Sequence, residues 1–360
     1  MVNWRDMIKK TIREKKSYSF NEIIANVKLN QNESPYDIPD KVKHIILERS
    51  LNREWNRYPS INGSPLRKAL SHYLNIPVEQ IIIGVGSDEL LGNTAVLILD
   101  KDKTVYIVEP TFQIYKQLAL VDEARLIIGR LNPDFSYPID EMVRVLRTKS
   151  IDLFIIAAPN NPTGTPLDIY SLEDLIKVAP GLVIVDEAYY EFSGVTMLPL
   201  MQKYDNLIIT RTFSKAFSLA GLRVGYLIAS PEIINFICKS RLPFSVNIFS
   251  ETAALTLLEN PSFIMENVIK ILDSKEKLYK ELIKIPGITV YPSATNFFMI
   301  DTGISGTEAA VRIGQLGVAI RDVSDHPMTI NCIRITVGTP EENQSLLKAL
   351  KLFIEGRNCG

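Results

Sequence analysis

Cysteine is scarce in this chain. Only three cysteines occur among 360 residues, and Cys238, Cys332 and Cys359 lie too far apart to form a metal-binding motif. A disulfide framework and a structural zinc site are therefore not expected. Because three free thiols suit a reducing compartment, the sequence predicts a cytoplasmic protein with no bound metal.

Long hydrophobic runs and an excess of one charge are also absent. The longest apolar runs, such as residues 182–185, have the length of a strand and cannot span a bilayer. The formal net charge of −1 predicts no attraction to nucleic acid or to a membrane surface. The basic segment 1–16 contains Asp6 and Glu14 and lacks the apolar centre of a signal peptide, so we expect an amphipathic helix there.

Strand-like and helix-like stretches alternate from about residue 80 to residue 230. This alternation is typical of an α/β fold with a mostly parallel central sheet flanked by helices on both faces. The expected strands are 81–85, 104–108, 124–128, 153–157, 182–186, 207–210 and 224–228. The expected helices are 88–99, 111–120, 139–149 and 172–178.

The pattern changes after Pro243. A long helical stretch over 250–285, broken only by Pro261, precedes several short strand-like runs, which indicates a smaller α+β domain. These runs are 288–291, 296–300, 318–321 and 333–336. We therefore divide the chain into an N-terminal arm (1–30), a large domain (31–243) and a small C-terminal domain (244–360).

A glycine-bearing turn at residues 84–89 follows an expected strand and begins a helix. Its backbone N–H groups could bind an anion, with Ser87 and Asp88 at the helix start. A dinucleotide fingerprint is the alternative interpretation. Two features disfavour it, because Glu89 replaces the third glycine and the spacing to Glu109, the candidate ribose ligand, is longer than usual.

Two further polar segments follow strands of the same expected sheet. Asn161 lies in Ala-Pro-Asn-Asn-Pro-Thr-Gly (158–164), which is either a simple turn or a loop that holds an amide for a ligand. Asp186 ends an apolar strand, where an unpaired carboxylate is costly, so it requires a salt bridge or a cationic ligand atom. Ligands of open α/β sheets bind at this carboxyl edge.

The segment 210–225 is the most informative part of the chain. Lys215 is flanked by the hydroxyls of Thr212 and Ser214, and Arg223 follows eight positions later between two glycines. A lysine that can form a Schiff base, next to groups that bind a phosphate dianion, is what a pyridoxal phosphate site requires. By itself the run could also be a solvated lysine and arginine at a helix start.

Taken in order, these segments resemble the fold-type I pyridoxal-phosphate-dependent aminotransferases. The resemblance extends over nearly the whole chain, and its finer motifs are most similar to the histidinol-phosphate aminotransferase family. It implies that family's fold: a large domain with a mostly parallel sheet and a smaller α+β domain. The motifs that carry it are 29–36, 57–59, 110–112, 159–164, 185–189, 214–225, 292–297, 320–322 and 333–339.

The resemblance implies a role for each cofactor-binding residue. Lys215 would hold pyridoxal 5′-phosphate covalently and then act as general base. Asp186 would pair with the ring nitrogen and keep it protonated. Asn161 and Tyr189 would donate hydrogen bonds to the ring 3-oxygen, which makes Lys215, Asp186 and Tyr189 the catalytic set. The phosphate would be held by Ser87, Asp88, Thr212, Ser214 and Arg223.

The same resemblance implies how substrate and partner subunit are recognised. Tyr58 would reach the phosphate in the neighbouring subunit of a homodimer. Arg334 lies in an apolar strand, where a guanidinium is costly unless paired, and its fork suits a carboxylate or phosphate. Arg321 is expected to point the same way, with a pair to a neighbouring aspartate as the alternative. Asn161 would also contact substrate, as would Tyr18, although Tyr18 lacks the Pro-Gly that follows this tyrosine in the family.

The implied reaction is amino transfer from histidinol phosphate to 2-oxoglutarate, which gives imidazole acetol phosphate and glutamate in histidine biosynthesis. It would proceed by a ping-pong route through pyridoxamine phosphate. Aromatic amino-acid aminotransferases and threonine-phosphate decarboxylases share the cofactor residues and are the alternatives. A non-catalytic ligand sensor of the same fold is a more remote one. The expected partners are a small amine and a 2-oxo acid.

Overall fold

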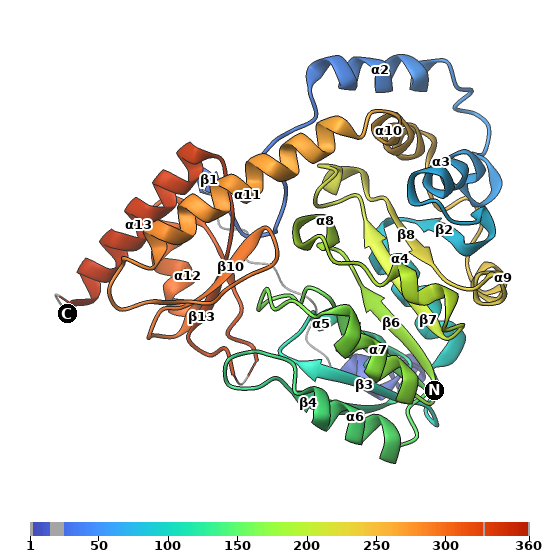
Figure 1. Ribbon diagram of the computed structural model, residues 1–360, viewed down its shortest axis with the longest axis horizontal. Coiled ribbons are helices and arrows are strands. Elements are labelled where there is room, and N and C mark those ends of the chain that lie inside the picture. The colour runs from blue at the N-terminus through green and yellow to red at the C-terminus, as the bar shows by residue number, and fades with distance from the viewer. Residues whose placement is uncertain (1–2, 15–24, 327, 359–360) are drawn as a thin grey trace.

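The computed structural model describes residues 3–14, 25–326 and 328–358 (Figure 1). These residues form a large α/β part and a smaller α+β part, and the long helix α11 (Ser262–Leu282) runs from one to the other. Among the described residues, no helix combines the length and apolar character needed to cross a membrane.

The large part is built on a seven-stranded sheet with the order β2-β8-β7-β6-β5-β3-β4. All neighbouring pairs are parallel except those of β8, which runs antiparallel to β2 and β7. The expected mostly parallel sheet is therefore confirmed. Its strands are β2 (Ile81–Gly84), β3 (Thr104–Glu109), β4 (Arg125–Arg130), β5 (Leu153–Ala157), β6 (Leu182–Asp186), β7 (Leu207–Thr212) and β8 (Gly225–Ile228).

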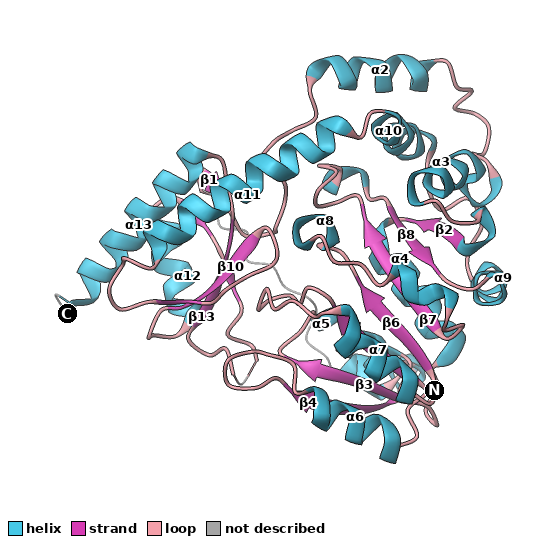
Figure 2. Ribbon diagram, in the orientation of Figure 1, coloured by secondary structure: helices cyan, strands magenta, loops and turns pink. Residues whose placement is uncertain are grey.

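Helices cover both faces of this sheet (Figure 2). Successive residues of a strand face opposite sides, so Val183 and Val185 of β6 enter one hydrophobic cluster and Ile184 enters the other. A strand buried on both faces must be apolar throughout, as β6 is up to Asp186. The flanking helices are α4 (Gly86–Ile98), α5 (Gln113–Val121), α6 (Ile139–Thr148), α7 (Ile169–Val178) and α9 (Pro231–Ser240).

Three more helices lie together beside this layer: α2 (Asp40–Leu51), α3 (Ser64–Leu74) and α10 (Ile248–Glu259). Although α10 follows Pro243, it packs against α2 and α3 of the large part. Pro261 then separates α10 from α11, as expected. The limits 1–30, 31–243 and 244–360 stay a prediction. Short elements of the same part are α8 (Tyr190–Ser193) and the 3-10 turns η2 (Ile61–Gly63), η3 (Val78–Gln80), η4 (Leu198–Gln202) and η5 (Ala220–Leu222).

The small part contains an antiparallel sheet of order β12-β13-β10-β9, which confirms the α+β expectation. Its strands are β9 (Thr289–Val290), β10 (Phe297–Asp301), β12 (Arg321–Asp322) and β13 (Cys332–Thr336), covered by α11, α12 (Gly306–Gln315) and α13 (Pro340–Asn358). A separate parallel pair joins β1 (Val27–Lys28) to β11 (Val318–Ala319). Residues Val27 and Lys28 thus pack on the small part shortly before the chain continues to α2 of the large part.

Two expectations are wrong. The single strand expected over 318–321 is two, because the chain changes sheet at Ile320: β11 pairs with β1, whereas β12 pairs with β13. The amphipathic helix expected over 1–16 is, within the described residues, a 3-10 turn η1 (Trp4–Met7) and a single helical turn α1 (Lys10–Arg13), separated by extended Ile8. Neither buries a residue, and helices without such packing are marginal in water.

Candidate active site

A cavity of about 450 Å³ opens at the carboxyl ends of β5, β6 and β7, and residues of both parts line it. Most of the site residues predicted from the sequence meet there. They are Ser87, Asp88, Asn161, Asp186, Tyr189, Thr212, Ser214, Lys215, Arg223, Arg321 and Arg334. Tyr58 is not among the lining residues and is 82% exposed. Tyr18 lies outside the described residues.

Lys215 follows β7 in a turn and lines the cavity. Its Nζ donates to the carbonyl oxygen of Gln31 at 2.8 Å. Burial lowers the pKa of the Lys215 amine to about 8, and the positive charge of Arg334 acts in the same direction. A fraction of this amine is therefore uncharged near neutral pH, which a nucleophile or general base requires.

Asp186 ends β6 and is buried. It accepts hydrogen bonds from the Tyr115 hydroxyl at 2.7 Å and from the Ala188 N–H at 3.1 Å. Burial raises the pKa of the Asp186 carboxyl to about 6, and the hydrogen bond from Tyr115 acts in the opposite direction. The structural salt bridge considered from the sequence is thus not formed by the described residues, and a cationic ligand atom remains the fitting partner.

Tyr189 and Asn161 face the same cavity from neighbouring loops. The Tyr189 hydroxyl accepts a hydrogen bond from Asn32 Nδ2 at 2.9 Å. Burial raises the pKa of the Tyr189 hydroxyl, so it stays protonated and can donate. Asn161 Oδ1 accepts from Arg334 Nη1 at 2.6 Å, which leaves the Asn161 NH₂ group as its donor to a ligand.

The opposite end of the cavity is suited to a phosphate. The first turn of α4 presents backbone N–H groups at a helix N-terminus, where an anion is favoured. Arg223 donates to Ser214 Oγ at 3.3 Å and forms an ion pair with the Asp88 carboxylate at 3.1 Å. The hydroxyl of Thr212 is nearby in the same lining. Hydroxyls, a guanidinium and helix N–H groups are the donor set that a phosphate monoester needs.

Two glycines allow this end to form. A Cβ on Gly86, whose φ is +77°, would lie 2.6 Å from Arg223 Nη2. A Cβ on Gly225 would lie 2.4 Å from the backbone nitrogen of Ser87. Only glycine lets the guanidinium and the start of α4 approach so closely.

Arg334 and Arg321 lie at the end of the cavity formed by the small part. They are directly paired across β13 and β12 in the antiparallel register. Arg334 is largely buried, and its Nη2 donates to the carbonyl oxygen of Asn30 at 3.0 Å. Two guanidinium groups on adjacent strands favour a substrate with an anionic group at this end.

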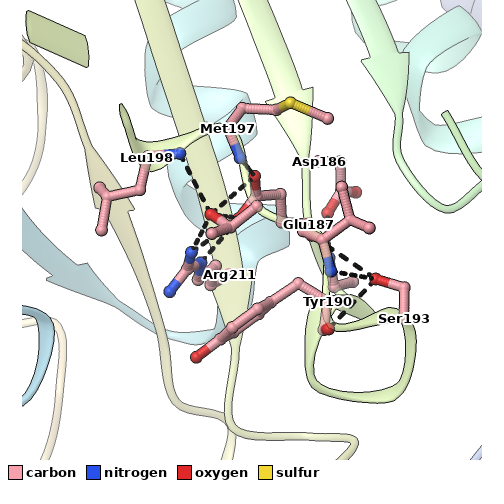
Figure 3. Close-up of polar contacts among 10 residues, drawn as sticks. Asp186, Glu187, Tyr190, Ser193, Met197, Leu198 and Arg211 are labelled. Carbon is pink, nitrogen blue, oxygen red and sulfur yellow. Dashed lines mark hydrogen bonds and ion pairs between the residues drawn. The ribbon is translucent and has the colours of Figure 1, made fainter. Parts of the chain in front are cut away.

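A buried ion pair between Glu187 and Arg211 lies next to Asp186 (Figure 3). Glu187, next to Asp186, accepts from Arg211 Nε at 2.9 Å, and neither side chain is more than 1% exposed. The same carboxylate accepts from the Thr196 hydroxyl and the Met197 N–H, and the Arg211 guanidinium lies 3.6 Å from the centre of the Tyr190 ring. The pair joins the end of β6, which carries Asp186, to the end of β7, which leads into the turn that carries Lys215.

Sequence reasoning missed four contributors: Asn32, Tyr115 and the Glu187–Arg211 pair. Asn32 lies in a segment singled out by motif, but no role could be assigned to it. Tyr115 is on the buried face of α5, where an aromatic residue is ordinary core. The described residues contain no group of three or more His, Cys, Asp or Glu side chains that could hold a metal ion.

The chain belongs to the aminotransferase class I and II family, whose pattern matches residues 25–350. Among curated proteins it is similar to histidinol-phosphate aminotransferase of Chlorobaculum tepidum, with 37% identity over 91% of this chain and 94% of that protein. The enzyme of the same name from Caldanaerobacter subterraneus subsp. tengcongensis is 33% identical over 96% of this chain and 98% of that protein.

Solved structures share the fold. Histidinol-phosphate aminotransferase from Sinorhizobium meliloti, in complex with pyridoxal-5′-phosphate, gives a TM-score of 0.88 at 24% identity and covers 97% of this chain and 98% of its own. L-threonine-O-3-phosphate decarboxylase from Porphyromonas gingivalis gives 0.80 at 22% identity over 91% of this chain and 99% of its own. At this identity the likeness is one of fold.

Proposed function

We propose that the protein is a pyridoxal-phosphate-dependent histidinol-phosphate aminotransferase. The observation that carries this proposal is the meeting of Lys215, Asp186 and Arg223 in one cavity, each in the surroundings that its role requires. The curated relatives of that name, at 33–37% identity over most of the chain, support the choice of substrate.

The residues present fit pyridoxal phosphate. The Asp186 carboxylate is buried and forms no ion pair within the described part of the chain, and a protonated ring nitrogen would supply a cationic partner. Asn161 and Tyr189 would donate to the ring 3-oxygen, and the start of α4 with Arg223 would hold the phosphate. The Asp88 carboxylate forms an ion pair with Arg223, so we expect the phosphate to compete with Asp88 for the Arg223 guanidinium. When bound, the cofactor supplies an electron-accepting ring that stabilises negative charge on the substrate carbon next to the amine.

The residues of this chain provide binding and proton movement. The Lys215 amine, with its pKa lowered to about 8, can remove the proton from the substrate carbon and return it to the acceptor atom. Asp186 would keep the ring nitrogen protonated, and Tyr189 would direct its hydroxyl proton toward the ring oxygen. Arg334, with Arg321 beside it, would orient the anionic end of the substrate so that its reacting carbon faces Lys215.

The substrate must present an anionic group in both half-reactions. Histidinol phosphate carries a phosphate monoester, and glutamate and 2-oxoglutarate carry carboxylates, so both can bind the Arg334 and Arg321 pair. An aromatic amino acid also carries a carboxylate. Comparison of kcat/KM for histidinol phosphate, phenylalanine, tyrosine and aspartate, each with 2-oxoglutarate, is therefore the test. A large preference for phenylalanine, or carbon dioxide release from threonine phosphate without need of a 2-oxo acid, would refute the substrate assignment.

The active unit in this proposal is a homodimer in the cytoplasm. Tyr58 projects into solvent and stacks on Phe244, with ring centroids 4.7 Å apart. Trp55, Ile61 and Leu242 are exposed apolar side chains from the same regions of the chain. Such surfaces mark protein contacts, and Tyr58 would reach the phosphate of the neighbouring subunit. Sedimentation of the purified protein should show a dimer. The variant Tyr58→Phe should bind the cofactor more weakly, and this variant should remain a dimer.

The cofactor assignment has a direct test. Purified protein given pyridoxal phosphate should turn yellow, and borohydride should fix the cofactor on the peptide that contains Lys215. Lys275 is a matched control, because burial also lowers its pKa to about 8 but it does not line the cavity. Labelling of Lys275 instead, or labelling that survives in Lys215→Ala, would refute the assignment.

A further inference from the structure

Residues Asn30, Gln31 and Asn32 form a short strap between the two parts of the molecule. The strap follows β1 and is bound to the small part by backbone hydrogen bonds of Leu29 with Ala319 and Thr336. Its own carbonyl oxygens accept from side chains that line the cavity: Asn30 from Arg334 and Gln31 from Lys215. The strap therefore contacts both the substrate arginine and the lysine.

Asn32 is held in one conformation by the small part. It is 1% exposed and has a φ of +54°, a left-handed conformation that asparagine tolerates better than most residues. Its N–H donates to Thr336 Oγ1 at 2.9 Å, and its carbonyl oxygen accepts from Asn296 Nδ2 at 3.1 Å. Both partners belong to the small part.

The orientation of the Asn32 amide follows from these bonds. The Thr336 hydroxyl accepts from the Asn32 N–H, so its own proton is free to donate to Asn32 Oδ1, at 3.3 Å. This leaves Nδ2 to donate to the Tyr189 hydroxyl oxygen at 2.9 Å. A hydroxyl that accepts in this way has its own proton directed elsewhere, here toward the cavity that Tyr189 lines.

We propose that Asn32 is a positioning residue that sets the Tyr189 hydroxyl as a donor to the cofactor ring oxygen and links that donor to the substrate-binding strand. Arg334 and Thr336 lie two residues apart on β13 and so share one face of the strand. The strand that would bind substrate through Arg334 thus also holds Asn32 through Thr336. This inference rests on the proposed cofactor.

The proposal has a spectroscopic consequence. In the loaded protein, negative charge on the ring oxygen would favour the protonated form of the Lys215 nitrogen. A hydroxyl that accepts from Asn32 is a stronger donor and disperses this charge. Loss of the Asn32 amide should therefore raise the pKa of the Lys215 nitrogen by about half a unit to one unit.

The test is Asn32→Gly, measured as the pH midpoint of the absorbance change of the bound cofactor. Glycine keeps the left-handed backbone and the backbone hydrogen bonds of residue 32, and it removes the side chain that carries the amide. Asn75→Gly is a matched control, because Asn75 has the same φ of +54° and does not line the cavity. The charged groups that act on Lys215 and Tyr189 are the same in the unchanged protein, Asn32→Gly and Asn75→Gly: Arg334, Arg223, Asp88, Glu33 and Asp186.

A double-mutant cycle separates positioning from general disturbance. In a Tyr189→Phe background the further change Asn32→Gly should move the midpoint by less than about 0.2 unit, because no hydroxyl remains to be oriented. Asn32→Asp offers an isosteric variant if the glycine protein does not fold. The new carboxylate would accept the Tyr189 proton and would add a negative charge, and both effects should raise the midpoint further.

Each outcome of these measurements either supports the proposed role of Asn32 or contradicts it. An upward shift in Asn32→Gly that disappears in the Tyr189→Phe background, with none in Asn75→Gly, supports the proposal. An unchanged midpoint, or an equal shift in both backgrounds, overturns it while the proposed function stands. A wild-type protein that takes up no cofactor overturns both.

Discussion

The Arg334 guanidinium donates to the side-chain oxygen of Asn161 at 2.6 Å. Arg334 belongs to β13 of the small part, and Asn161 follows β5 of the large part, so this bond connects the two across the cavity. It places the residue proposed to bind the substrate anion directly on the residue proposed to bind the cofactor ring. Binding of the substrate anion to Arg334 should therefore affect the position of Asn161, and binding of the cofactor ring to Asn161 should affect the position of Arg334.

Arg334→Lys should lower kcat/KM for histidinol phosphate by about 10- to 100-fold, because an ammonium cannot replace the bidentate fork or reach both Asn161 and Asn30. Steady-state kinetics in both half-reactions would measure the effect. Arg321→Lys is the comparison within the same site, since Arg321 pairs with Arg334 in the strand register. If Arg334→Lys leaves both half-reactions unaffected, Arg334 does not bind substrate.

Asp186 should make the cofactor-free protein less stable as the pH rises. Its folded-state pKa of about 6 lies above the usual 3.8, so the folded chain retains a proton that the unfolded chain releases between these values. The stability that this group contributes is complete below pH 4 and is lost through pH 6. Asp186→Asn should therefore stabilise the cofactor-free protein by about 1–3 kcal/mol at pH 8.

Urea unfolding of the cofactor-free forms at pH 4.5 and pH 8 checks this prediction. The gain from Asp186→Asn should be mostly absent at the lower pH, and the other titrating groups cancel because both proteins carry them. The affinity of Asp186→Asn for the cofactor should be lower than that of the unchanged protein, because a protonated ring nitrogen needs the carboxylate as its partner. An equal gain at both pH values would mean that Asp186 has no raised pKa.

The strands of the large sheet could be predicted because their buried runs are short and β-branched. The strands expected at 153–157 and 182–186 have the bounds of β5 and β6. Helix starts were less accurate: α7 begins at Ile169 rather than 172 because Asp168 accepts hydrogen bonds from the N–H groups of Tyr170 and Ser171. An N-cap aspartate is a local signal that could have been used.

Site residues were predictable where their own chemistry is distinctive, as for Lys215. Asn32 and Tyr115 were not, because their roles depend on partners far along the chain. Asn32 meets Tyr189 across 157 positions, and Tyr115 meets Asp186 across 71. Only the folded arrangement of the two parts reveals those contacts.

Glu187→Gln should destabilise the protein by about 3–5 kcal/mol, because it leaves the Arg211 charge buried without its counter-ion. Chemical denaturation measures the change. Asp273→Asn is the control, since it removes the exposed ion pair with Lys277 on α11 and should cost less than about 0.5 kcal/mol. Similar small effects in both variants would show that the buried pair is dispensable.

Two glycines of α4 should respond to alanine in opposite directions. Gly92 has no atom within 4 Å of a built Cβ, so Gly92→Ala should stabilise the helix by about 0.5–1 kcal/mol. Gly86 has a φ of +77°, and its Cβ would lie 2.6 Å from Arg223 Nη2. Gly86→Ala should therefore displace the guanidinium and reduce cofactor affinity by about tenfold or more. Titration with pyridoxal phosphate, followed by absorbance, compares the two variants. Equal affinities would mean that the phosphate does not bind at the start of α4.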